Sequence, residues 1–251
     1  MSDYEANLDY EKYLVSEWDD YPSHPERYRA SLAAVNGKKV THVLDVGCGA
    51  GQELLPFVRE LGARGAGVDI SPKAIEVARR QFAALDCRDQ VEFSCCPAES
   101  LPYPDGRFDV VMCRVALPFT ENGVALSEMA RVLRPDGLVI LKIHHFLYYW
   151  RRFWIALGRR QVRQAAAIGR VLFNGTVYHL TGRQPHHGPR MREVFQTRWM
   201  LRRVFARLGL QIRGELQNSD SNHRSPVYLI ERATPASLPK LEVVGTPATA
   251  A

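Results

Sequence analysis

Three glycines alternate with other residues directly after an apolar run, and an aspartate ends the next apolar run. Gly47, Gly49 and Gly51 form the pattern G-x-G-x-G, and Asp69 follows Gly51 by 18 residues. Glycine lets the backbone approach a ligand closely at the start of a helix. A carboxylate at the end of the neighbouring strand can accept hydrogen bonds from both hydroxyls of a ribose. Together the two features predict a site for a cofactor that contains adenosine.

Apolar runs alternate with helical periods around this turn. Runs with strand character cover residues 40–46, 64–70, 91–96, 108–113 and 138–143, and helical patterns lie between most of them. This alternation predicts a parallel, doubly wound α/β sheet. After residue 195 a helix precedes two further strands, 210–216 and 227–232, which a short polar loop joins. We expect these last two strands to pair antiparallel.

Composition and charge exclude several classes of protein. Of the 251 residues, 46% are hydrophobic and 24% are charged, which is an ordinary globular composition and excludes a disordered or fibrous chain.

The net charge is −6 over residues 1–143 and +12 over residues 144–251, where 16 of 17 cations are arginine. Such an excess suits an anionic substrate, an anionic lipid or nucleic acid, or simply a solvated face. Charged residues interrupt the most apolar stretch, 139–157, so we predict no transmembrane helix.

The five cysteines favour reduced thiols. Their number is odd and no C-x-x-C occurs, which argues against a zinc ribbon and against a disulfide framework. The acidic, polar start of the chain lacks a secretory signal. We therefore expect a cytoplasmic protein.

Four segments of the core resemble the class I S-adenosylmethionine-dependent methyltransferases. They are VLDVGCGAG (43–51), GVDIS (67–71), PAESLPYPDGRFDVVMCRVALPF (97–119) and EMARVLRPDGLVIL (128–141). The resemblance is closest to the small-molecule branch that includes the ubiquinone and menaquinone methyltransferases. It implies a Rossmann-like, doubly wound α/β fold of seven strands with an antiparallel last strand, and S-adenosylmethionine as the cofactor.

The resemblance also implies which residues bind that cofactor. Asp69 would bind the ribose diol and Ile70 would contact the adenine. Pro97 stands where relatives commonly carry an aspartate for the adenine amino group, which leaves that group to a backbone carbonyl or a neighbouring side chain. The implied cofactor-binding residues are Asp45, Gly47, Cys48, Gly49, Gly51, Asp69, Ile70, Ala98, Glu99, Cys113 and Arg114.

Histidines are the candidate bases. A base is needed only when the acceptor must lose a proton. His144 and His145 directly follow the fifth strand, and ligands bind at the carboxyl ends of strands in this architecture, so we predict them as catalytic. His179 and the pair at 186–187 are weaker candidates. No acidic or cysteine cluster accompanies that pair, and we predict no metal site.

Residues 146–173 show a helical period. At 100° per residue, the arginines at 152, 159, 163 and 170 lie on one line, opposite Leu147, Trp150, Trp154, Leu157, Ala165, Ile168 and Leu172. We expect this helix to cap the substrate pocket with its apolar face. A membrane-surface helix or a contact with nucleic acid would fit the same pattern. The sequence leaves these alternatives open.

The sequence predicts five regions and a function. The regions are an N-terminal helical lid (1–36), a cofactor-binding core (37–143), a helical cap insertion (144–195), the rest of the core (196–232) and a disordered tail (233–251). The expected function is methyl transfer to O, N or C of a small apolar or aromatic acceptor, in secondary metabolism or quinone biosynthesis. An RNA methyltransferase and a non-catalytic, cofactor-binding partner subunit are the alternatives, although no separate RNA-binding module is evident. The sequence does not indicate an oligomeric state. It is compatible with peripheral contact with a membrane.

Overall fold

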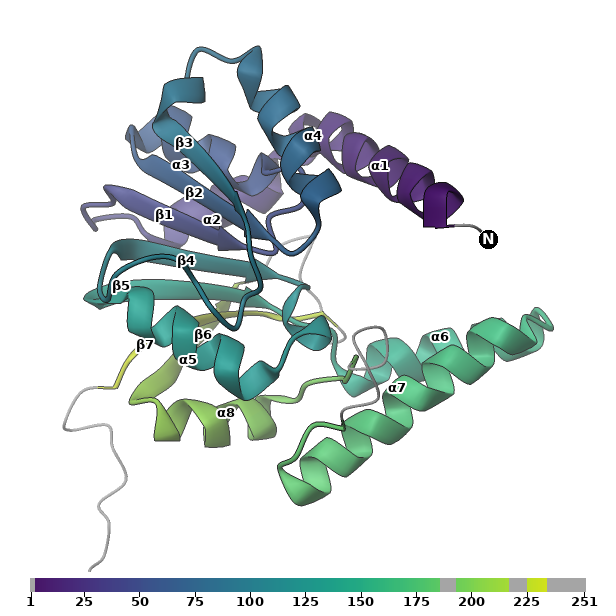
Figure 1. Ribbon diagram of the computed structural model, residues 1–251. Helices are drawn as coiled ribbons and strands as arrows, with labels where there is room; N and C mark the ends of the chain where they lie inside the picture. Colours follow the sequence, from purple (N-terminus) through teal and green to yellow (C-terminus); the bar gives the residue numbers. More distant parts are fainter. Residues whose placement is uncertain (1–2, 186–192, 217–224, 234–251) are drawn as a thin grey trace, which may run out of the picture.

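Seven strands form one sheet in a computed structural model of the chain (Figure 1). The structure describes residues 3–185, 193–216 and 225–233, with the side chains described from residue 10 onward. The strand order is β3-β2-β1-β4-β5-β7-β6. The strands are β1 (His42–Val46), β2 (Arg64–Asp69), β3 (Val91–Cys95), β4 (Phe108–Arg114), β5 (Leu133–Lys142), β6 (Leu210–Leu216) and β7 (Val227–Arg232).

The direction of the strands confirms the predicted topology. Neighbours among β1 to β5 pair parallel, whereas β7 is antiparallel to both β5 and β6. The order of the strands along the sheet reverses between β1 and β4. In doubly wound sheets a ligand binds at such a reversal, outside the carboxyl ends of the strands.

Helices cover both faces of the sheet. On one face Phe57 of α3 packs in the same cluster as Val43, and on the other Phe205 of α8 packs with Leu44. Successive residues of β1 thus point to opposite faces, as the pleat of a strand requires. The helices are α1 (Asp3–Asp20), α2 (Pro25–Ala34), α3 (Leu55–Leu61), α4 (Pro72–Ala83), α5 (Asn122–Val132), α6 (Phe146–Gly158), α7 (Val162–Thr181) and α8 (Arg198–Arg207).

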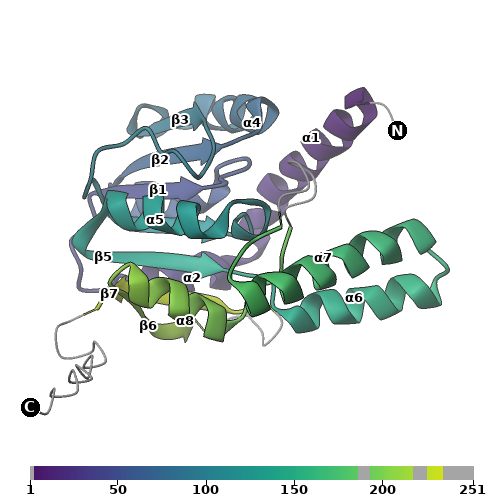
Figure 2. The same cartoon turned by 60° about the horizontal axis from the view of Figure 1, so that its bottom comes forward.

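The insertion after β5 is a hairpin of two helices, so the single helix expected over 146–173 is wrong. α6 ends at Gly158, and α7 returns antiparallel beside it (Figure 2). Arg160, between them, adopts a φ of +56°, in the left-handed region that helices do not use. The arginine line and the apolar face that we expected therefore span two helices. The helical period continues across the turn by coincidence.

Some expectations concern residues outside the described part of the chain. The histidine pair at 186–187 and the tail beyond residue 233 belong to this group. In the described part, no helix has the length and apolar character that crossing a membrane requires.

Candidate functional site

A cavity of about 1360 Å³ opens at the carboxyl ends of the parallel strands. It is larger than the roughly 300–1,000 Å³ of an ordinary ligand pocket, so it has room for two ligands side by side. α1 contributes part of the wall, and both α1 and the α6–α7 hairpin extend from this end of the sheet (Figure 2). The lining includes Tyr10, Tyr13, Asp45, Gly47, Gly49, Glu53, Asp69, Ile70, Ala98, Glu99, Arg114, Phe119, Lys142 and His144.

The glycine turn after β1 forms the floor of the cavity. The main-chain N–H groups of Gly47 and Cys48 both donate to the carbonyl of Val68, at 2.8 and 3.0 Å, and so tie the turn to the end of β2. Gly47 and Gly49 have φ values of +75° and +54°, which glycine adopts without strain. The backbone can therefore bend sharply here and lie exposed to a ligand.

Asp69, at the end of β2, is held in place by two main-chain donors. Its Oδ2 accepts from the N–H of Gly49 at 3.1 Å, and its Oδ1 accepts from the N–H of Ser71 at 2.9 Å. The side chain of Ser71 in turn accepts from the N–H of Ala74 and caps α4. The carboxylate lines the cavity in a fixed orientation, which suits a pair of hydroxyl donors.

Asp45 supplies a second carboxylate on the same wall. Burial is the main reason that its pKa rises to about 8, and the nearby Glu53 raises it further. A buried carboxylate with such a pKa ionises more readily when a cation approaches. Asp45 is therefore suited to a positively charged ligand group.

A buried cluster of charged residues lies near Asp45, centred on Glu53. The Glu53 carboxylate accepts from Nε of Arg27 at 2.7 Å and pairs with Nε of Arg114 at 2.9 Å. The hydroxyl of Tyr21 donates to its other oxygen at 3.3 Å. Glu53 and Arg114 each have side chains only 5% exposed. These contacts join α2 to the glycine turn and to the end of β4, beside the cavity.

Lys142 and His144 follow this cluster along the end of β5. Burial lowers the pKa of Lys142 to about 7, and Arg114 and Arg27 lower it further, against the opposite effect of Glu53. Burial, together with Lys142, lowers the pKa of His144 to about 4. The His144 ring stacks on Tyr148 with centroids 3.7 Å apart, and its Nδ1 lies 3.0 Å from the hydroxyl of Ser225. At neutral pH this imidazole is uncharged and held by its neighbours.

Nine of the eleven predicted cofactor-binding residues line the cavity, and Gly51 and Cys113 do not. Gly51 serves packing, because a Cβ there would lie 2.9 Å from the ring of Phe93. Cys113 is fully buried in the core on β4, one residue before the strand reaches the cavity at Arg114. Side chains alternate between the two faces of a strand, so Cys113 points to the face opposite to that of Arg114.

The candidate histidines lie in different surroundings. His144 lines the cavity, whereas His145 caps α6 by accepting from the N–H of Leu147 at 3.4 Å and is not part of the lining. His179 lies between the carbonyl of Gly175 at 2.6 Å and the hydroxyl of Thr197 at 2.8 Å, also outside the lining. Its contacts join α7 to α8. His145 therefore lies outside the lining of this cavity, and its catalytic role stays a prediction.

The expected cap does not cover this cavity in the structure. In the part of the chain that is described, no residue of α6 or α7 lines the cavity, and Leu147, Trp150 and Trp154 remain exposed. Both helices bury a different face, which packs within the hairpin against Phe195. α1, by contrast, contributes Tyr10 and Tyr13 to the lining.

Glu53, Arg27 and Lys142 were not predicted as site residues. Signals in the sequence could have indicated two of these three residues. Glu53 is an acid that directly follows the glycine turn within an apolar helix, and Lys142 is a lone cation that ends an apolar strand. Arg27 offers no such local signal, because only the fold brings α2 to the cavity.

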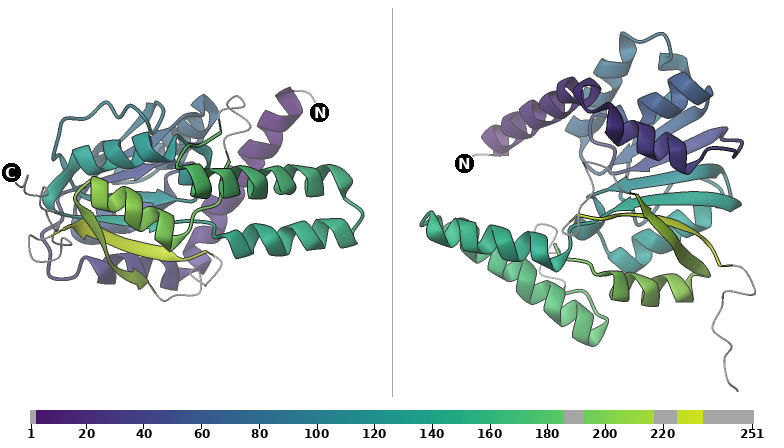
Figure 3. Two further views of the ribbon diagram at one scale, coloured as in Figure 1. Left: turned by 90° about the horizontal axis from the view of Figure 1, so that it is seen from below. Right: turned by 180° about the vertical axis from the view of Figure 1, so that it is seen from behind.

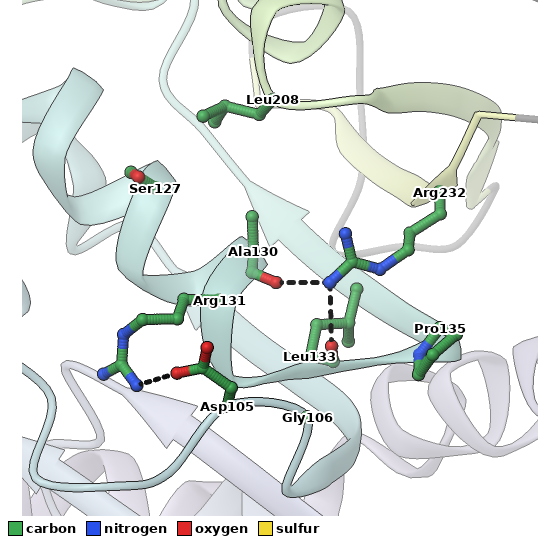
Figure 4. A pocket seen from close by; sticks show the side chains of 9 residues that line it. All are labelled: Asp105, Gly106, Ser127, Ala130, Arg131, Leu133, Pro135, Leu208 and Arg232. Atoms are coloured by element: carbon green, nitrogen blue, oxygen red, sulfur yellow. Dashed lines mark hydrogen bonds and ion pairs between the residues drawn. The ribbon is translucent and has the colours of Figure 1, made fainter.

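A second cavity, of about 470 Å³, lies at the opposite end of the sheet (Figure 4). Its arginines serve the structure: Arg131 pairs with Asp105 at 2.9 Å, and Arg232 donates to the carbonyls of Ala130 and Leu133 at 2.9 and 3.1 Å. These contacts hold the start of β5. The amino ends of parallel strands are not where such sheets bind ligands.

The chain is similar to known proteins over the part that carries the glycine turn and Asp69. Residues 43–137 match the family model described as methyltransferase domain. The chain is 34% identical over 172 residues to a demethylmenaquinone methyltransferase of Symbiobacterium thermophilum, covering 59% of this chain and 67% of that protein. The chain belongs to the class I S-adenosylmethionine-dependent methyltransferases of the small-molecule type. S-adenosylmethionine is its cofactor.

Two further comparisons bear on the sequence and on the fold, respectively. The uncharacterized methyltransferase YcgJ of Bacillus subtilis is 41% identical over 107 residues, which cover 41% of this chain and 40% of YcgJ. The structure of magnesium protoporphyrin IX methyltransferase from Synechocystis, with bound S-adenosylhomocysteine, aligns with a TM-score of 0.55 at 20% identity, covering 83% of this chain and 81% of that one. The latter likeness shows the Rossmann-like fold.

The residues of this methyltransferase fit the cofactor. Asp69 presents carboxylate oxygens for a ribose diol, and Asp45 offers a counter-charge for the cationic end of the methionine moiety. Ile70 is 73% exposed at the cavity wall, as an apolar surface for a planar base would be. Glu99, expected at the adenine edge, accepts from the N–H of Glu121 at 2.7 Å and fixes the adjoining loop.

Cofactor affinity is expected to rise with pH. Below about pH 8 the Asp45 carboxyl of the free protein is mostly protonated, so a cationic ligand group must first displace that proton. Affinity for S-adenosylhomocysteine should then increase by up to about tenfold per pH unit between pH 6 and pH 8. Calorimetric titration at several pH values measures this. The Asp45→Asn variant should bind more weakly and lose the dependence; a dependence that persists in it would exclude Asp45 as the origin.

Proposed function

We propose that this methyltransferase transfers the methyl group to a hydroxyl oxygen of a small aromatic acceptor, a phenol or quinol, and that Lys142 accepts the hydroxyl proton. The observation that carries the proposal is the position of a lysine with a pKa of about 7 in the cavity wall. A base works best when its pKa lies near the working pH. His144, with a pKa of about 4, is a much weaker proton acceptor.

The rest of the wall suits an aromatic ring. Tyr13 and Phe119 line the cavity and are more than half exposed, and His144 adds a third ring. Aromatic side chains bind planar ligands by stacking and edge contacts. The similarity to a demethylmenaquinone methyltransferase supports an acceptor of the quinol class.

The protein's own groups carry out the proton transfer and the alignment. When bound, S-adenosylmethionine would supply an electrophilic methyl group: the acceptor oxygen would gain the O–C bond while the S–C bond breaks with its electron pair going to sulfur, and S-adenosylhomocysteine would be left. The neutral Lys142 amine takes the hydroxyl proton and later releases it to water. The Arg114 guanidinium, on the same wall, favours the negative charge that develops on the oxygen. The cavity wall would hold the acceptor in place beside the cofactor.

Replacing Lys142 with methionine is expected to lower kcat/KM about a hundredfold, because a positioned base contributes at least about that much. In the native enzyme kcat/KM should rise with pH and level off above about pH 7, where the amine is neutral. The variant should lose this rise. Lys39→Met, which removes an exposed lysine, is the matched control and should leave the profile unchanged.

The same experiment separates a base from a binding cation. Turnover is measured with a panel of phenols, quinols and amines, and with total RNA, and products are identified by mass spectrometry. If Lys142 acted only as a cation for an anionic acceptor, kcat/KM would fall above pH 7 and Lys142→Arg would retain activity. That result, or products methylated on carbon, nitrogen or RNA, would contradict the proposal.

A further inference from the structure

The α6–α7 hairpin leaves apolar side chains exposed on its surface. The two helices pack on each other through Tyr149, Ala156, Ala165 and Ile168 and extend away from the sheet (Figure 3). On α6 a second stripe, Leu147, Trp150, Trp154 and Leu157, falls within an arc of about 80° beside that buried face. These four side chains are between 40% and 52% exposed. On α7 the side chains of Val162, Phe173 and Leu180 are at least 66% exposed.

The hairpin is also exclusively cationic. Residues 146–181 contain six arginines and no aspartate or glutamate. All six arginines are exposed: Arg151, Arg152, Arg159, Arg160, Arg163 and Arg170. Arg159 and Arg160 form the turn between the helices, next to the exposed Leu157 and Val162. The tip therefore combines positive charge with apolar surface.

We propose that the α6–α7 hairpin docks on the surface of an anionic lipid bilayer. Tryptophan lies favourably at the boundary between headgroups and acyl chains, and arginine binds lipid phosphates. Helices that lie in this boundary combine a basic face with a Trp- and Leu-rich face, as α6 does. The docking surface is defined as the apolar stripe of α6, the tip at 157–163 and the exposed side chains of α7.

The observations fit a bilayer better than other occupants. Aliphatic side chains such as Leu147, Ile155 and Leu157 gain nothing from the phosphates of a nucleic acid, whereas the acyl region of a bilayer buries them. A second copy of the hairpin would bring arginines against arginines, and neither helix carries an acid to pair them. Charge complementarity therefore selects an anionic partner that can also bury apolar surface.

Docking would bring the cavity close to the lipid. The hairpin and α1 extend from the same end of the sheet as the cavity (Figure 2). Tyr148, in the first turn of α6, stacks on His144 in the cavity wall. An apolar acceptor dissolved in the bilayer would thus have a short path to the site. Docking of the hairpin would not depend on which acceptor the enzyme methylates.

Co-sedimentation with vesicles tests the proposal. The full chain should bind vesicles that contain phosphatidylglycerol and should bind pure phosphatidylcholine weakly, and salt should weaken the binding. Replacing Arg159, Arg160 and Arg163 with glutamine should weaken binding about a hundredfold, because each cation near such a surface contributes about a factor of five. The matched control replaces three exposed arginines elsewhere, Arg59, Arg64 and Arg88, and should bind as the native protein does.

A second variant tests the apolar contribution. Trp154→Ser should weaken vesicle binding at least tenfold while the affinity for S-adenosylhomocysteine stays unchanged, since Trp154 is exposed and outside the cavity. Equal loss of binding in the tip and control variants would overturn the proposal. So would binding to total RNA with no binding to vesicles, or a dimer in sedimentation velocity that the tip variant abolishes.

Discussion

Asp69→Ala is expected to weaken S-adenosylhomocysteine binding by roughly a hundredfold to ten-thousandfold. Two hydrogen bonds from the ribose hydroxyls to a charged acceptor would be lost, each worth about 1.5–3 kcal/mol. The main-chain donors of Gly49 and Ser71 would also lose their acceptor, so the glycine turn and the start of α4 would be held less firmly. Calorimetric titration measures the effect.

Two further variants sharpen this measurement. Asp69→Asn keeps one oxygen for a main-chain donor and should lose less affinity than alanine. Asp86→Ala removes a carboxylate that is 90% exposed and should change nothing. Full affinity in Asp69→Ala would remove this residue from the cofactor site, even though it lines the cavity.

Glu53→Gln is expected to lower the free energy of unfolding by about 3–5 kcal/mol. The change leaves the guanidinium groups of Arg27 and Arg114 in a buried place without their carboxylate, and unpaired buried charge is strongly destabilising. For a domain of this size the midpoint of thermal unfolding should fall by about 10 °C. Thermal and urea denaturation of the purified variant provide the measurement.

The exposed pair of Glu92 and Arg107 is the matched control. Its atoms are 2.8 Å apart, much as in the buried cluster, but both side chains are at least 34% exposed. Glu92→Gln should therefore cost less than about 1 kcal/mol. Equal losses in the two variants would contradict the importance of burial in this cluster.

Glu53→Gln also has a consequence for the pH profile. Glu53 raises the pKa of Lys142, so its neutralisation should lower that pKa below about 7. The rise of kcat/KM should then move to lower pH, provided the variant is assayed below its unfolding temperature. A loss of stability alone would leave the position of the rise unchanged.

Local pattern was sufficient to predict the sheet and the place of the glycine turn and Asp69 at the cavity. The run from Val43 to Val46 buries both faces of a strand, and only glycine bends readily at the positive φ of positions 47 and 49. Because Asp69 ends the neighbouring strand, its place beside that turn follows from parallel pairing. Each of these features depends on residues close in sequence, which is why it could be read from the chain.

The structure decided the features that depend on distant residues. Arg27 and Glu53 meet across 26 positions, and the pKa of Lys142 depends on burial and on charges from α2, the glycine turn and β4. The helical period over 146–173 carried no sign of the turn at Arg160, because side-chain spacing by itself does not show where the backbone reverses. Whether the apolar face of α6 covered the cavity was likewise a matter of packing. Burial and electrostatic energy depend on what surrounds a group in space, and only the folded chain defines those surroundings.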